Sequence, residues 1–400
     1  MSAPAPAGDA AAAQSPRPAH WIVLAGVAGL CVLAYLPIFR QPLIEDDFPN
    51  VELARRWIEL LADPVFRYRT AHWIVTFAVD RFSGFSTPAF YAASLAMHIA
   101  ATWVLYAFGS LPRIGWRVAG FAAAFFAVYE GHQEAIMWYS ASAETLMFIF
   151  GAGAALMWAR RRYTLSFVLF ALALATKESA IVFAPLMLLL DRNWKRWVPV
   201  AALAAAYMAL IAAGRAQSFR FNDGSFSLSA PFWITWPVSY FRLLWIWGLL
   251  ALAVLAVRRK WPRVASLGLQ WMAVALLPYV WLTYMHRVPS RQVYLASAGL
   301  ALLVGAAFTL LRPRAAAIVA AILITVNLGY LWTRKRAQYL ERAAPTQALI
   351  ERARSAPGTV YVRCFPRAPI IAEAAARLGA GKRVVFQPEP GATEWCWDKR

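Results

Sequence analysis

The chain has 400 residues, of which 61% are hydrophobic and only 15% are charged. A soluble domain of this length would have about a quarter of its residues charged, so the composition excludes an ordinary soluble protein. The net charge of +20 would suit a nucleic-acid-binding protein, but most Lys and Arg residues lie in short loops between apolar runs. In such loops they set membrane topology and contact lipid headgroups, and we expect no nucleic-acid partner.

Apolar runs recur along the chain and predict an all-α polytopic membrane protein with about eleven spanning helices. The N-terminus, residues 1–20, is rich in Ala and Pro and predicts a disordered cytoplasmic segment. Residues 21–333 form the predicted transmembrane domain. We expect spans at 21–39, 88–108, 118–130, 141–159, 163–176, 179–190, 197–213, 234–257, 264–284, 292–311 and 315–332.

The positions of the basic loops give the orientation of these spans. Arginine-rich loops follow the even-numbered spans, which places them in the cytoplasm by the positive-inside rule. The run Arg334–Lys335–Arg336 follows the last span and is the exception; keeping the odd number of spans, we expect the tail outside. The first outer loop, residues 40–87, interleaves arginines with aromatic residues, which is typical of amphipathic helices in the membrane interface.

The C-terminal tail, residues 334–400, changes character and predicts a small extracytoplasmic α/β appendage. Helical periodicity at 347–356 and 370–378 alternates with strand patterns at 359–363 and 383–386. Cys364 and Cys396 both lie in this tail. Because the tail is expected on the oxidising side of the membrane, a disulfide between them and two separate thiols are both open.

Acidic residues are scarce, yet Glu45, Asp46 and Asp47 are adjacent in the first outer loop. One interpretation is a solvated loop with a helix cap; the other is an acid/base or metal-binding group. Further polar residues lie at the predicted outer ends of the spans, where burial of a charge is costly and indicates a cavity or a paired partner. These candidates are His132, Glu134, Glu144, Lys177, Glu178, Arg287, Arg291 and Tyr294.

Each candidate also has a purely structural interpretation. Lys177 and Glu178 would form a local ion pair at a hairpin turn, and Arg287 and Arg291 would face lipid headgroups. Taken together, however, carboxylates beside Arg and Lys suit a substrate with a phosphate leaving group and an acceptor hydroxyl. A carboxylate can take the acceptor's proton while the cations stabilise charge on the departing phosphate.

Four short motifs occur in order along residues 20–310: Asp46-Asp47, His132-Gln-Glu134-Ala-Ile-Met-Trp138, Lys177-Glu-Ser-Ala180 with Pro185, and Arg291-Gln-Val-Tyr294-Leu-Ala-Ser297-Ala-Gly299. This combination resembles the GT-C glycosyltransferases, and within them the protein O-mannosyltransferase-like branch, which includes the membrane domains of tetratricopeptide mannosyltransferases. Tetratricopeptide repeats are not found after the last span, so the resemblance does not single out a protein as the acceptor.

The resemblance implies a hexosyltransferase that moves a sugar from a polyprenyl-phosphate-linked donor to an extracytoplasmic protein, lipid or glycan. It implies a multi-pass protein of the bacterial inner membrane whose site faces the periplasm. Asp46 and Asp47 inherit the role of catalytic base, with the choice between them open, and Glu45 is expected to be merely solvated. Arg287 and Arg291 are candidates for the donor phosphate, and the remaining outer polar residues would bind substrate.

Three matters stay open at this point. A carboxylate pair can hold a divalent cation such as Mg²⁺ or Mn²⁺, but Arg and Lys can neutralise a phosphate without one. A transporter or flippase of a lipid-linked anion would use the same charged cavity without chemistry, and would place charges near the membrane midplane. A polysaccharide polymerase or ligase is a second alternative.

Overall fold

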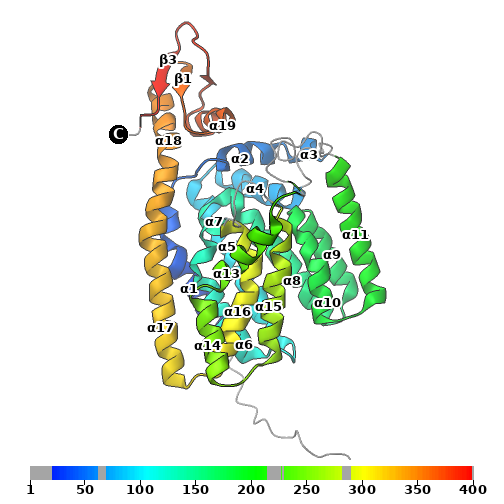
Figure 1. Ribbon diagram of the computed structural model, residues 1–400. Helices are drawn as coiled ribbons and strands as arrows, with labels where there is room; N and C mark the ends of the chain where they lie inside the picture. The colour runs from blue at the N-terminus through cyan, green and yellow to red at the C-terminus, as the bar shows by residue number, and fades with distance from the viewer. Residues whose placement is uncertain (1–19, 62–68, 214–226, 228, 282–289, 399–400) are drawn as a thin grey trace, which may run out of the picture.

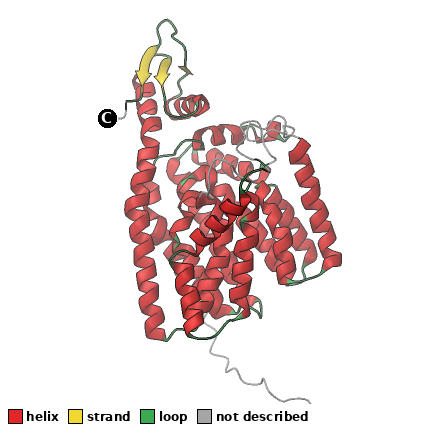
Figure 2. Cartoon of the chain, in the orientation of Figure 1, coloured by secondary structure: helices red, strands yellow, loops and turns green. Residues whose placement is uncertain are grey.

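The computed structural model describes residues 20–61, 69–213, 227, 229–281 and 290–398. These residues are mostly helical, and a small three-stranded sheet stands at one end of the helical bundle (Figure 2). The predicted fold class, an all-α polytopic membrane protein with a small α/β appendage, is confirmed.

The bundle contains the predicted spanning segments. Among the described residues, six helical stretches are long and apolar enough to cross a membrane. A seventh is the pair α13 and α14, bent by 70° at its break, and three shorter apolar helices accompany them. The segments are α1 (His20–Tyr35), α5 (Thr87–Ala107), α6 (Trp116–Val128), α8 (Ala143–Ala159), α9 (Tyr163–Leu174), α10 (Phe183–Leu190), α11 (Trp194–Ala213), α13 (Phe232–Leu244), α14 (Trp247–Val257), α15 (Arg263–Ala275), α16 (Tyr294–Phe308) and α17 (Pro313–Tyr330).

Helix α16 is the centre of the bundle, and all of its residues are buried. It packs against α15, α6 and α14. A Cβ atom added at Gly268 on α15 would collide with the carbonyl oxygen of Gly299 on α16, and the reverse substitution would collide with the carbonyl of Gly268. Because lipid supplies no hydrophobic force between helices, close backbone approach through small residues is a main source of their association.

Substitution of Gly268 or Gly299 by Ala is therefore expected to destabilise the bundle by about 1–3 kcal/mol, the usual cost of overpacking a tight contact. Thermal unfolding of the detergent-solubilised protein would measure the change. Gly26→Ala on α1 is the matched control, since a Cβ atom there meets nothing within 4 Å. Equal melting temperatures for Gly268→Ala and Gly26→Ala would contradict the expectation.

The end of the bundle that carries α2 (Asp47–Arg55), α3 (Trp57–Leu60) and α4 (Thr70–Ser83) is here called the upper end. These helices of the first loop lie across the bundle instead of continuing it (Figure 1). Their sequences are less apolar than those of the spanning helices, as expected for amphipathic helices at an interface. The opposite, lower end carries the arginine-rich connections that follow α5, α8, α10, α14 and α16.

The last spanning helix does not end at the membrane surface. Helix α17 continues through the π-turn η10 (Leu331–Lys335) into α18 (Arg336–Ser355), giving 43 consecutive helical residues. At 1.5 Å per residue this is about 65 Å, roughly twice the thickness of the hydrocarbon core. The predicted domain boundary at residue 334 falls inside this helix, and so does the basic run that breaks the positive-inside pattern.

The appendage consists of β1 (Val360–Cys364), α19 (Pro369–Ala380), β2 (Val384–Val385) and β3 (Thr393–Cys396). The strands are parallel in the order β2-β1-β3; β3 is an addition to the predicted elements. A disulfide joins Cys364 and Cys396, whose Cα atoms are 4.6 Å apart. Helix α19 packs on α2, and Arg377 forms an ion pair with Glu52 at 3.3 Å. The appendage is thus tied to the membrane domain.

Candidate active site

A broken stretch of chain organises the upper end. Between α6 and α8 the chain forms three short helical turns, η4 (Glu130–His132), α7 (Gln133–Met137) and η5 (Tyr139–Ser142). We call residues 130–142 the connecting segment. Most of its residues are buried, so its polar groups need protein partners. The segment finds them on the first loop, on α4 and on the 290–293 turn, and it thereby brings together residues that are far apart in sequence.

The first partner of the connecting segment is Asp47, at the start of α2. Its side chain is fully buried. One carboxylate oxygen accepts a hydrogen bond from the backbone N–H of Ile44 at 2.9 Å, and the other accepts one from the backbone N–H of Ser140 at 2.7 Å. Burial raises the pKa of Asp47 to about 7, although the two backbone hydrogen bonds oppose this shift. Asp47 therefore fixes the first loop to the connecting segment.

Asp46 differs sharply from its neighbour, since it is solvent-exposed at the N-cap position of α2. Glu45, expected to be merely solvated, is instead held by two arginines of the C-terminal region. Arg342 of α18 lies 2.6 Å from its carboxylate and Arg367 lies 2.9 Å from it. The expectation for Glu45 was wrong because hydropathy gives no sign that α18 passes beside the first loop.

Two arginines enclose an aromatic ring at the end of α7. The guanidinium of Arg291 lies 5.0 Å from the ring centroid of Trp138, and that of Arg342 lies 4.6 Å from it. Both distances are in the range of cation–π interactions. Glu134 accepts a hydrogen bond from the backbone N–H of Arg291 at 3.0 Å, and its carboxylate is 3.7 Å from the Arg291 guanidinium. We call Glu134, Trp138, Arg291 and Arg342 the Trp138 cluster.

The indole N–H of Trp138 is buried and has no hydrogen-bond partner among the described residues. Buried donors are almost always satisfied by protein, water or ligand. A donor of this kind beside two guanidinium groups makes the Trp138 cluster suited to an anion.

A second charged group lies where α9 meets α10. Lys177 forms a buried ion pair with Glu144 at the start of α8, and the hydroxyl of Tyr279 donates a hydrogen bond to the same carboxylate at 3.1 Å. Next to Lys177, Glu178 accepts hydrogen bonds from Arg69 at distances between 2.8 and 3.2 Å. This second pair remains partly exposed, so it borders solvent while the first does not.

Two of the predicted substrate-binding residues lie elsewhere. His132 and Tyr294 are fully buried among the helices. Nε2 of His132 lies 2.6 Å from the Ser297 hydroxyl, and the Tyr294 hydroxyl lies 2.8 Å from Nδ1 of His98. Both residues therefore pack as buried polar residues between the helices. A substrate would reach them only if the helices separated. Arg287, the other candidate for a phosphate, lies outside the described residues.

The sequence left open whether the carboxylates of this site hold a metal ion. In the described part of the chain, no group of three His, Cys, Asp or Glu side chains is arranged to hold a metal ion. Both oxygens of Asp47 already accept backbone hydrogen bonds. A Mg²⁺ or Mn²⁺ ion at the adjacent carboxylates stays a prediction from the sequence.

Known structures resemble this arrangement of helices. A crystal structure of ArnT from Cupriavidus metallidurans bound to undecaprenyl phosphate aligns over 94% of this chain and 90% of that chain, with a TM-score of 0.57 at 13% identity. The apo structure of the same protein aligns over 92% and 86%, with a TM-score of 0.54 at 13% identity. The chain shares the fold of ArnT, which is the GT-C fold. No protein-family model and no curated protein sequence matches the chain.

Within the GT-C fold, the structure adds residues that the sequence did not single out as site residues. Arg342 reaches the site from α18, Tyr279 from the short helical turn after α15, and Arg69 from the first loop. Arg69 belongs to the arginine–aromatic pattern of that loop, so a signal for it existed. For Tyr279 and Arg342 none existed, because their contacts join residues more than 130 positions apart.

The buried ion pair of Lys177 and Glu144 yields a stability prediction. Lys177→Met alone leaves the Glu144 carboxylate buried without its counter-charge, which is expected to cost about 3–5 kcal/mol. The double variant Lys177→Met/Glu144→Leu should recover part of that loss, because no uncompensated charge remains. The melting temperatures of the single and the double variant would measure the loss of stability and its recovery. As a control, Arg56→Met breaks an exposed pair with Glu59 and should cost less than about 1 kcal/mol.

The raised pKa of Asp47 predicts a pH dependence of stability. The folded state binds a proton at about pH 7, whereas an unfolded Asp binds one near pH 3.9. Folding is therefore favoured as the pH falls from 8 to 5, with a slope of up to about 1.4 kcal/mol per pH unit. The melting temperature of the wild type should rise relative to that of Asp47→Asn over this range. If the melting temperatures of the two proteins changed equally with pH, the raised pKa of Asp47 would be contradicted.

Proposed function

We propose that this protein transfers a hexosyl group from a polyprenyl-phosphate-linked donor to an acceptor hydroxyl outside the cytoplasm. The observation that carries the proposal is the presence of an exposed carboxylate, Asp46, and the Trp138 cluster at the same end of a GT-C fold. The binding of undecaprenyl phosphate by ArnT supports a donor of this class. The mannosyltransferase-like subtype rests on the sequence motifs.

The orientation that we propose follows from charge. The lower end carries the arginine-rich connections, and the positive-inside rule favours the cytoplasm for that end. The upper end, with the candidate site and the disulfide-bonded appendage, would then face the periplasm of a bacterial inner membrane. Arg334, Lys335 and Arg336 do not weigh against this orientation, because they lie within a continuous helix and not in a short loop between spans.

We assign the two adjacent aspartates different roles. A general base must reach the proton that it removes. Asp46 is exposed and can meet an acceptor, whereas Asp47 is fully buried with both oxygens hydrogen-bonded to the backbone. Asp46 is therefore our candidate for the catalytic base. Asp47 is a positioning residue that holds the first loop on the connecting segment.

The reaction uses these groups as follows. The acceptor hydroxyl oxygen forms a bond to the anomeric carbon while its proton passes to the Asp46 carboxylate. The bond between the anomeric carbon and the phosphate oxygen breaks, and its electron pair leaves with the polyprenyl phosphate. We assign the stabilisation of the negative charge on that phosphate to Arg291, Arg342 and the indole N–H of Trp138, which has no hydrogen-bond partner among the described residues. Arg69 and Glu178 border the same end and are candidates for sugar contacts.

Transfer assays on purified protein test these roles. With a radiolabelled polyprenyl-phosphate hexose and a membrane extract as acceptor source, Asp46→Asn is expected to lower kcat by about 10²–10⁴, the usual contribution of a general base. Arg291→Gln should raise KM for the donor, because its guanidinium binds the phosphate. Glu59→Gln, which alters an exposed carboxylate in the same loop, is the matched control and should retain activity.

Full activity of Asp46→Asn would overturn the assignment of the base. If the wild type transfers no sugar but carries labelled donor across the bilayer of proteoliposomes, the protein is a flippase and the proposed chemistry is wrong. Elongation of a glycan by many units in one encounter would instead identify a polymerase.

A further inference from the structure

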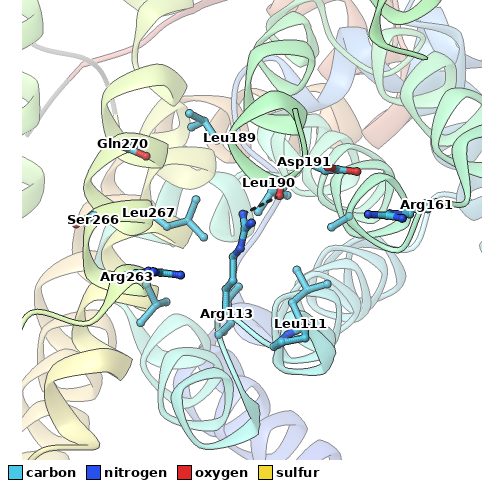
Figure 3. A pocket seen from close by; sticks show the side chains of 14 residues that line it. Leu111, Arg113, Arg161, Leu189, Leu190, Asp191, Arg263, Ser266, Leu267 and Gln270 are labelled. Atoms are coloured by element: carbon cyan, nitrogen blue, oxygen red, sulfur yellow. Dashed lines mark hydrogen bonds between the residues drawn. The ribbon is translucent and has the colours of Figure 1, made fainter. Parts of the chain in front are cut away.

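A cavity of about 450 Å³ opens at the lower end of the bundle, opposite the candidate active site. Four parts of the chain line it: the turn between α5 and α6, the end of α8, the end of α10 and the start of α15 (Figure 3). None of the residues discussed for sugar transfer takes part in it. A role for this cavity is therefore independent of sugar transfer and uses only the membrane orientation proposed above.

Three guanidinium groups from three of these elements line the cavity. Arg263 is the first residue of α15, Arg113 lies in the turn before α6, and Arg161 follows α8. Figure 3 shows Arg113 between Arg263 on one side and Arg161 on the other. The Arg113 side chain donates a hydrogen bond to the carbonyl oxygen of Leu190 at 3.2 Å, which holds its guanidinium at the rim.

Within the described part of the chain, these arginines form no ion pair with a carboxylate. Among the described residues, no carboxylate lies within 4 Å of any of the three guanidinium groups in an ion pair. Asp191 is the one acidic residue in the lining, and its carboxylate accepts a long hydrogen bond, 3.4 Å, from the Tyr163 hydroxyl. Three positive charges against one negative charge leave an excess that favours an anion.

The start of α15 adds to this preference. Its N-cap residue is Pro262, and no side chain caps the helix. The N–H groups of the first turn have no partner within a helix, and the helix dipole places partial positive charge there. Arg263, Val264 and Ser266 from this first turn line the cavity, so the helix terminus and the arginines act on the same space.

Apart from Ser266 and Gln270, the remaining walls are apolar. Leu111, Ile114, Leu189, Val264 and Leu267 line the cavity together with the arginines. A purely aqueous anion would leave this surface wet, whereas an amphiphile would place its charged group on the arginines and its chain on the leucines. Basic pockets between helices at the cytoplasmic face are the kind of site that holds anionic lipid headgroups.

We propose that this cavity, with Arg113, Arg161 and Arg263, binds a phosphate group, and that its source is the headgroup of an anionic phospholipid. The guanidinium groups recognise the phosphate through charge and paired hydrogen bonds. The same chemistry would accept a soluble phosphate ester, and the experiment separates the two sources.

The test measures the melting temperature of the purified full chain in a neutral detergent, with added short-chain phosphatidylglycerol, short-chain phosphatidylcholine, glycerol 3-phosphate or inorganic phosphate. Phosphatidylglycerol is expected to stabilise the wild type and phosphatidylcholine is not, since a ligand that binds the folded state raises its stability. The variant Arg113→Gln/Arg161→Gln/Arg263→Gln should lose most of that shift. The matched control is Arg258→Gln/Lys260→Gln/Arg314→Gln, which removes three exposed charges from the same end and should keep it.

A single variant keeps the test decisive if the triple variant does not fold. Asp191→Asn removes the carboxylate from the lining and should lower the phosphatidylglycerol concentration at half-maximal stabilisation by about fivefold. An unchanged midpoint in Asp191→Asn would overturn the proposal. So would an equal response to phosphatidylcholine, or an equal loss in the control variant. Stabilisation by glycerol 3-phosphate and inorganic phosphate equal to that by the lipid would support the phosphate site and identify a soluble source.

Discussion

The hydrogen bond from the backbone N–H of Ser140 to the buried Asp47 carboxylate is the contact on which the upper end depends. Polar groups below a membrane surface have no water to satisfy them, so each must find a protein partner. The connecting segment is buried, and it meets this requirement by bonding to Asp47, to His72 through Ser142 and to Arg291 through Glu134. These hydrogen bonds bring the residues of the candidate site together.

The same requirement separates residues that hold the site from residues that can act in it. Three charged residues of the upper end are buried and bonded within the protein. Asp47 accepts backbone hydrogen bonds, and Lys177 forms an ion pair with Glu144. Asp46 is exposed, and Arg291 and Glu178 are partly so. In this fold, the buried charges fix the geometry of the first loop and of the turn before α10, whereas Asp46, Arg291 and Glu178 keep part of their surface open to solvent.

The two ends of the bundle use arginine differently. At the upper end, Arg342 and Arg291 are each close to a carboxylate and to the face of Trp138, so their positions are fixed by neighbours of opposite charge. At the lower end, Arg113, Arg161 and Arg263 line a cavity that has a single acidic residue. The upper arginines are therefore held in place by carboxylates, whereas among the described residues no carboxylate forms an ion pair with Arg113, Arg161 or Arg263.

The sequence by itself determined the fold class, the order of the spanning segments and the end of the bundle at which the acidic motifs lie. Hydropathy and loop charge decide these features locally. The sequence also indicated the cysteine pair and most elements of the tail. Only the tertiary structure showed that Glu45 meets Arg342 and Arg367, that Asp47 is buried beside an exposed Asp46, and that His132 and Tyr294 pack inside the bundle. Those outcomes depend on helix packing between distant segments, which periodicity along the chain cannot specify.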